Sequence, residues 1–211
     1  MVLKKFYFLL SLSFASLGTA QLQESIVHKK LYIKANTLFL PFGVLNAGLE
    51  YQLNKKMTLQ GEVFVSPWKS FAGKYAQVYM IGSDARYYFN EAFKHWYVGA
   101  NFSFARYKIQ KYNYWSGGPY QYTETSPVYR TSDLYQDGFS FFLGGVVGYQ
   151  FQLNEKWNMD FFLGAGTAQS YYKGYHKILG VRYDTDPDRS YNQSGEWIPY
   201  RGGVMISYQL K

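Results

Sequence analysis

Seven charged residues fall at alternate positions within stretches that are otherwise apolar or built of small residues. They are Lys34, Glu50, Glu62, Asp84, Arg86, Asp160 and Arg201. Three are basic and four are acidic, so they can neutralise one another almost completely. An unpaired charge in a low-dielectric interior is costly, which favours charges that pair with one another or with trapped water. The sequence therefore predicts a mutually paired network inside the fold, and a path for protons or a metal ion is the functional alternative.

Another set of residues supplies the side-chain types of a nucleophilic Ser–His–acid arrangement. Ser170, His176 and Glu196 fall in or next to the last long polar stretch of the chain. Such an arrangement is recognised by its geometry and not by its order in the chain. Solvated polar residues are the simpler interpretation, so we predict no catalytic residue and keep an enzyme that modifies lipid A as the alternative.

Metal-binding patterns are incomplete. Asp184, Asp186 and Asp188 alternate as in a calcium loop, but the glycine at the sixth position and the closing glutamate of an EF-hand are missing. No two of the three histidines have strand or helix spacing suited to a metal site, and there is no cysteine. These histidines are His28, His95 and His176. We predict neither a metal site nor a cofactor.

An aromatic segment is the best candidate for a binding surface. Its members are Tyr112, Tyr114, Trp115, Tyr120 and Tyr122. The segment contains Gly117-Gly118-Pro119, which is typical of a loop. Flat rings can face sugars or a protein partner, whereas packing within the loop or at a membrane interface is the alternative.

The elements that must position these residues are strands. Between Gln77 and Phe89 one phase is mainly apolar or aromatic, and Asp84 and Arg86 fall in the other. Side chains at successive positions of a strand point to opposite faces, so this alternation indicates a strand with two different faces. The pattern predicts eight strands, at residues 31–40, 45–53, 57–67, 77–89, 96–109, 138–153, 157–171 and 197–210.

The connections between these strands alternate in length. Short polar turns are expected at 54–56, 90–95 and 154–156, and long loops at 66–76, 110–137 and 172–196. Pro41-Phe42-Gly43 makes one tight connection on the long-loop side. This asymmetry is typical of an outer-membrane barrel with its short turns in the periplasm.

Composition decides which face of the sheet meets lipid. Aromatic residues make up 21% of the chain, with 23 tyrosines, and crowd one phase, whereas Gly, Ser, Asn and Gln fill the other. Only small groups fit inside an eight-stranded barrel, and a surface in water would carry many Lys and Glu. We therefore predict an all-β fold, an eight-stranded antiparallel up-and-down transmembrane β-barrel with a polar, plugged lumen. A soluble barrel of lipocalin type is the alternative.

The first residues predict export. Lys4 and Lys5 precede an apolar stretch, and Gly18-Thr19-Ala20 offers small residues for cleavage. We predict a signal peptide at 1–20, a short periplasmic leader at 21–30 and one barrel at 31–211 in a Gram-negative outer membrane. The net charge of +8 comes without a basic run, so outer-membrane lipid and the barrel-insertion machinery are the expected partners, and nucleic acid is not.

Several short motifs together resemble a domain-of-unknown-function family of small Gram-negative outer-membrane barrels, often found near fimbrial assembly genes in gut anaerobes. The motifs are Lys34-Ala35-Asn36, Gly48-Leu49-Glu50-Tyr51, Pro67-Trp68, Asp84-Ala85-Arg86-Tyr87-Tyr88-Phe89, His95-Trp96 and Lys156-Trp157-Asn158. The resemblance implies location and fold and supplies no catalytic residue. We expect a non-catalytic barrel that is structural or presents loops to fimbrial components, glycans or other surface partners. The alternatives are a lipid A-modifying enzyme and a small channel.

Overall fold

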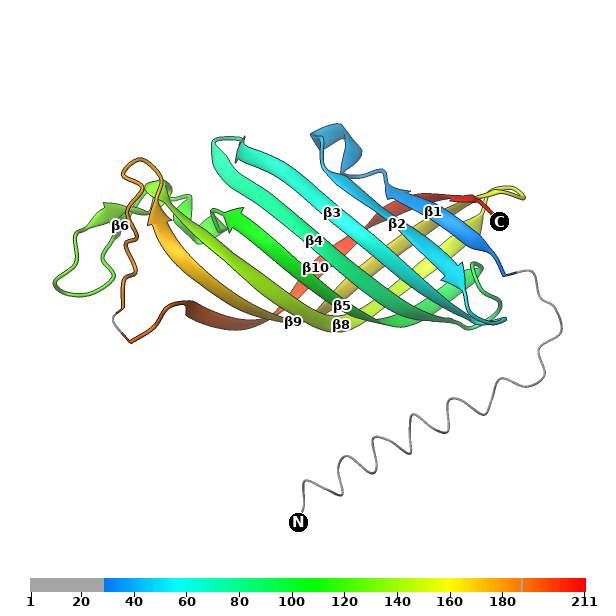
Figure 1. Cartoon of the computed structure of the whole chain (residues 1–211). Helices are drawn as coiled ribbons and strands as arrows, with labels where there is room; N and C mark the ends of the chain where they lie inside the picture. Colours follow the sequence, from blue (N-terminus) through cyan, green and yellow to red (C-terminus); the bar gives the residue numbers. More distant parts are fainter. Residues whose placement is uncertain (1–28, 187) are drawn as a thin grey trace, which may run out of the picture.

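Eight antiparallel strands form a closed hydrogen-bonded ring in which the first strand pairs with the last (Figure 1). The structure, a computed structural model, describes residues 29–186 and 188–211. The strands of the ring are β1 (Leu31–Asn36), β2 (Leu45–Gln52), β3 (Met57–Phe71), β4 (Lys74–Tyr88), β5 (His95–Ile109), β8 (Leu134–Gln152), β9 (Trp157–His176) and β10 (Asn192–Gln209). The prediction of eight antiparallel strands is confirmed. The predicted signal peptide and most of the predicted leader lie outside the described residues.

Each strand of the ring lies beside its neighbours in the sequence. The one insertion is a small two-stranded sheet of β6 (Pro119–Tyr120) and β7 (Tyr129–Arg130), within the loop between β5 and β8. In the described residues, three short 3-10 helices lie in the connections, at Leu40–Phe42, Tyr112–Tyr114 and Thr131–Asp133. None of the helices in the described part of the chain has the length and apolar character needed to cross a membrane.

Two of the short connections are built in the same way. In one, Asn54 Oδ1 accepts hydrogen bonds from the backbone N–H groups of Lys56 and Met57, both at 2.9 Å. In the other, Asn154 Oδ1 accepts from Lys156 at 2.9 Å and from Trp157 at 3.0 Å. Asparagine favours turns because its side chain bonds to the backbone two residues onward. These turns lie at one end of the ring, here called the turn end, and the longer connections lie at the other, the loop end.

The prediction of a long loop at 66–76 is wrong, because β3 and β4 extend through most of these residues and are joined by a two-residue turn. Ala72 and Gly73 both have positive φ, 48° and 79°, as a tight hairpin turn requires. Pro67 had suggested the end of a strand. However, β2 pairs with β3 only as far as Val65, so Pro67 has a free edge, where a residue without an N–H is tolerated.

The first strand is shorter than expected, and three later strands are longer. Strand β1 ends at Asn36, whose side-chain Oδ1 accepts from the N–H of Leu38 at 3.3 Å and turns the chain. By contrast, β8, β9 and β10 span 19, 20 and 18 residues, so the wall is tallest there (Figure 1). The ring closes along a short seam between β1 and β10, from Tyr32↔Gln209 to Asn36↔Met205.

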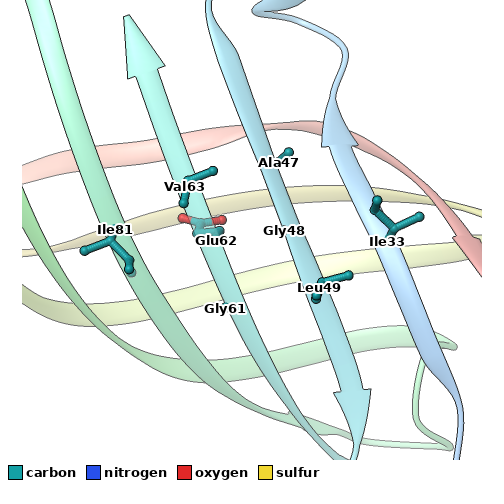
Figure 2. Close-up of a pocket in the computed structure, with 9 residues that line it drawn as sticks. Ile33, Ala47, Gly48, Leu49, Gly61, Glu62, Val63 and Ile81 are labelled. Carbon is teal, nitrogen blue, oxygen red and sulfur yellow. The ribbon is translucent and has the colours of Figure 1, made fainter.

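The two faces of the ring differ as the alternation predicts. On β5, Asn101 and Ser103 face the interior with 1% and 0% of their surface exposed, whereas Phe102 between them is 53% exposed. Figure 2 shows the outer face at β1–β4, where Ile33 and Val63 belong to a group of aliphatic side chains around Gly61. The outside of the ring is therefore apolar and the inside polar.

Candidate functional site

The seven charged residues singled out in the sequence all lie inside the ring and form one connected network. Their side chains are at most 3% exposed. They come from six strands, because Lys34 is on β1, Glu50 on β2, Glu62 on β3, Asp84 and Arg86 on β4, Asp160 on β9 and Arg201 on β10. The structure thus brings together side chains up to 167 positions apart in the sequence through the closure of the ring.

Arg86 is the centre of this network. Its guanidinium lies 2.9 Å from Asp84 Oδ2, 3.0 Å from Asp160 Oδ2 and 3.4 Å from Glu50 Oε2. The same group lies over the ring of Tyr97, 4.7 Å from its centroid. A planar guanidinium with five donors suits such a site, because it can meet several carboxylates at once.

Lys34 completes the same half of the network. Its Nζ lies 2.7 Å from Glu50 Oε2 and 2.6 Å from Asp160 Oδ2, so the two carboxylates that face Arg86 also share this ammonium. Tyr97 donates its hydroxyl to Asp160 Oδ1 at 2.9 Å, and Thr58 donates to Glu50 Oε1 at 2.6 Å. The buried carboxylates are therefore met both by charges and by neutral donors, as buried ions require.

Arg201 extends the network toward the loop end. It pairs with Asp84 and with Glu62, the latter at 2.8 Å. The register of β10 shifts between Pro199 and Arg201, so one extra residue, Tyr200, is inserted there. This β-bulge aims Tyr200 inward as well, and its hydroxyl donates to Asn101 Oδ1 at 2.7 Å.

The interior is filled at the turn end by aromatic side chains that the sequence did not single out. Phe93, only 2% exposed, comes from the short connection before β5 and packs 4.5 Å from Tyr32 and 6.1 Å from Tyr88, measured between ring centroids. Its φ of 70° is unusual for a residue with a side chain. The sequence did offer one signal that Phe93 fills the interior, since it is an apolar residue within a short polar turn.

Between the network and the loop end lies a cavity of about 270 Å³. Its lining includes Phe64, Met80, Phe142 and Phe162, with Glu62 and Arg201 as charged members. Phe142 packs against Tyr200 with ring centroids 4.9 Å apart, which narrows the interior at this level.

At the loop end, tyrosines and a buried aspartate form a second polar cluster, here called the loop-end cluster. Its members are Tyr114, Tyr120, Tyr129, His176, Tyr183 and Asp184. The hydroxyls of Tyr114 and Tyr183 lie 3.1 Å apart, and the ring of Tyr183 packs so closely on Gly174 that it would clash with any side chain there. Burial, together with the hydrogen bond to Tyr114, raises the pKa of the Tyr183 phenol well above its ordinary value. The cluster is therefore held mainly by tyrosine side chains around one carboxylate, which also pairs with Arg182.

The five aromatic residues predicted to bind a partner divide into two groups. Tyr112 is 82% and Trp115 57% exposed, so both present their rings outward. Tyr114 is buried in the loop-end cluster, and Tyr120 packs edge-on against Tyr183 with centroids 5.6 Å apart. Tyr122 is half-buried. The predicted surface therefore consists of two exposed rings beside others that anchor the loop.

The residues considered for nucleophilic chemistry, and Asp184 of the possible calcium loop, have other partners. Ser170 Oγ lies 2.6 Å from Ser140 Oγ, and Glu196 Oε1 lies 3.1 Å from Lys111 Nζ. His176 Nδ1 accepts from the backbone N–H groups of residues 178 and 179. Asp184 accepts from Arg182 Nε at 2.7 Å and from the N–H of residue 174 at 2.5 Å. Among residues 29–186 and 188–211, no three His, Cys, Asp or Glu side chains are placed to share a metal ion.

The fold and its interior define a class of protein, an all-β ring with an apolar outer face and a buried, paired charge network. The chain belongs to a family described as protein of unknown function (DUF3575), whose model matches residues 6–210. No curated protein matches the sequence significantly. The family assignment agrees with the resemblance to a domain-of-unknown-function family and leaves location and role to be proposed.

Proposed function

We propose that this protein is a plugged, non-catalytic β-barrel of a Gram-negative outer membrane, exported with a cleaved signal peptide. The outer face of the ring carries this proposal. Along β5 the outward positions are apolar from Trp96 to Phe104, and charge begins at Arg106. With a rise of about 3.3 Å per residue and a tilt of about 45°, the height is about 19 Å from Trp96 to Phe104 and about 23 Å from Trp96 to Arg106, close to the apolar band of such barrels.

Aromatic residues at the turn end support a barrel whose short turns lie at a membrane surface. Trp96 packs edge-on against Tyr149 at 5.2 Å, and Trp157 packs against Tyr208 at 5.0 Å between ring centroids. Tryptophan and tyrosine favour the boundary between lipid and water because their rings are amphipathic. These pairs lie next to the short turns, which are placed in the periplasm.

The charge network favours a structural role for the interior over conduction or catalysis. Its carboxylates are occupied by buried cations and neutral donors. Aromatic side chains fill the interior toward the turn end, and beyond the cavity of about 270 Å³ the loop-end cluster lies at the other end. Function then belongs to the loops, where Tyr112 and Trp115 present exposed rings. The partners that we propose for these rings are fimbrial components or glycans at the cell surface, in line with the family resemblance.

Two measurements test the proposal. The protein should fractionate with the outer membrane and migrate faster on a gel unboiled than boiled, because closed barrels keep their structure in detergent. Recovery in the soluble fraction, or extraction by carbonate, would contradict it. Lipid A from a deletion strain should have an unchanged mass spectrum, and an altered spectrum would favour the enzyme.

A further inference from the structure

Three cations gather on the outer face of the ring, just beyond the apolar band at the loop end. Lys108 on β5 and Lys173 on β9 lie on either side of Asp137 on β8, since the register pairs Lys108↔Asp137 and Asp137↔Lys173. Arg106 lies one row closer to the band, opposite Phe139. The side chains of Arg106 and Lys108 are 50% and 44% exposed. With one acid among three cations, the group carries an excess of two positive charges.

A polar cleft of about 190 Å³ opens among these side chains. It is lined by Arg106, Asp137, Phe139, Lys173, Tyr175 and Tyr191. Asp137, 15% exposed, pairs with Arg106 inside the cleft and lies 3.1 Å from Lys108 Nζ, which is just outside the cleft lining. Lys173 is placed differently, with its Nζ 4.7 Å from the centroid of the Tyr191 ring. The cleft therefore has a cation on each side, Arg106 from β5 and Lys173 from β9, and includes two tyrosines in its lining.

We propose that this cleft binds a phosphate group of the acylated, phosphorylated glycolipid in the outer leaflet. Arginine and lysine beside a membrane surface attract anionic headgroups, and a guanidinium matches phosphate oxygens. A lipid suits the position better than free phosphate, because Phe139 and Tyr171 stack 5.3 Å apart directly below Lys108 and Lys173 and offer an apolar surface to acyl chains. This inference rests on the proposed outer-membrane location.

The test uses the full-length protein purified from outer membranes in a mild non-ionic detergent, with bound glycolipid measured by native mass spectrometry. The paired variant Arg106→Gln with Lys173→Gln should retain at least about tenfold less glycolipid than wild type, since both headgroup contacts are lost. The matched control is Lys69→Gln with Arg130→Gln, which removes one lysine and one arginine from exposed positions at the same end of the ring. The control should bind like wild type.

Two further arms identify the ligand. In nanodiscs, the phosphorylated glycolipid should bind and its dephosphorylated form should bind at least about tenfold more weakly. Inorganic phosphate at millimolar concentration should not displace it. Asp137→Asn should bind at least as well as wild type, because an opposing carboxylate is removed.

Each contrary result overturns the inference. Equal retention by the paired variant and the control, equal binding of the dephosphorylated lipid, displacement by free phosphate, or loss of binding in Asp137→Asn would do so. If the paired variant fails to fold, Lys173→Gln alone keeps the test valid, and it should lower retention measurably. Failure of the wild-type protein to reach the outer membrane would instead refute the proposed location.

Discussion

The charge network and the loop-end cluster are both polar and both lie inside the ring, yet they are held together differently. The network joins charges from six strands, and Arg86 alone meets three carboxylates. The loop-end cluster joins phenols and one local ion pair, between Asp184 and Arg182. Its residues Tyr114, Tyr120 and Tyr129 are all supplied by the loop between β5 and β8. The first depends on the ring being closed, whereas the second depends on one loop folding back. Stability should therefore reside in the network, and the loops should be free to change.

Breaking the network should have the largest effect. Arg86→Ala leaves Asp84, Asp160 and Glu50 without their shared cation, and removal of one partner of a buried ion pair costs about 3 to 5 kcal/mol. Urea unfolding of the protein in vesicles measures the loss. Lys156→Ala, at an exposed turn, is the control. Equal midpoints for wild type and Arg86→Ala would show that the network does not stabilise the ring.

The closing strand offers the next test, because the network can form only when β10 meets β1. Tyr208 lies on the outer face of β10, against Trp157. Under the proposed location, Tyr208 also forms, with Arg201, Gly203 and Ile206, the final-strand pattern that we expect the barrel-insertion machinery to read. Tyr208→Asp should lower the outer-membrane level of the protein several-fold, although a charge near the interface costs only about 0 to 1 kcal/mol in stability. Wild-type levels on an immunoblot of outer-membrane fractions would contradict the assigned phase of the strand.

A matched change in the loop-end cluster should be milder. Tyr183→Phe removes the hydroxyl that lies 3.1 Å from Tyr114 and keeps the ring, so the loss should be about 0.5 to 1.5 kcal/mol and local. Proteolysis of the loop at residues 177–191 should accelerate while the heat-dependent gel shift stays unchanged. A global loss of stability as large as that of Arg86→Ala would erase the distinction between the two regions.

The exposed rings of the aromatic loop should matter least to folding. Tyr112→Ser with Trp115→Ser removes two outward side chains and should change stability by no more than about 0.5 kcal/mol. Binding to surface partners, measured with labelled protein on intact cells or on a glycan array, should be lost. Replacement of residues 112–122 by a Gly/Ser linker should also preserve the ring, but it should expose the loop-end cluster because Tyr114 and Tyr120 are both removed. Unchanged binding in both variants would leave the loop without a role.

The alternation of side chains made the strands and their inward charges predictable, because the period of two directly reports the two faces of a sheet. What it missed depends on contacts between distant segments. Pro67 lies within β3 because β2 pairs with β3 only as far as Val65, so the missing N–H of the proline breaks no hydrogen bond. The bulge in β10 turns the successive side chains of Tyr200 and Arg201 inward. Phe93 enters the interior from a turn, where no period exists to mark it. The aromatic loop was predicted as one surface. In the structure Tyr114 is buried against Tyr183, whereas its neighbours Tyr112 and Trp115 are exposed, and this contact with a distant loop could not be read from the sequence.

The central claim is that the outer face of the ring meets lipid, and spin-label accessibility measures this directly. The chain contains no cysteine, so single cysteines at Phe102 and Leu143 can be labelled in vesicle-reconstituted protein, with Lys55→Cys at a turn as the control. We predict that labels at 102 and 143 collide with oxygen, which concentrates in lipid, and are shielded from a water-soluble nickel chelate, whereas the label at 55 meets the chelate. Free access of the chelate to 102 and 143 would show that this face lies in water and would contradict the claim.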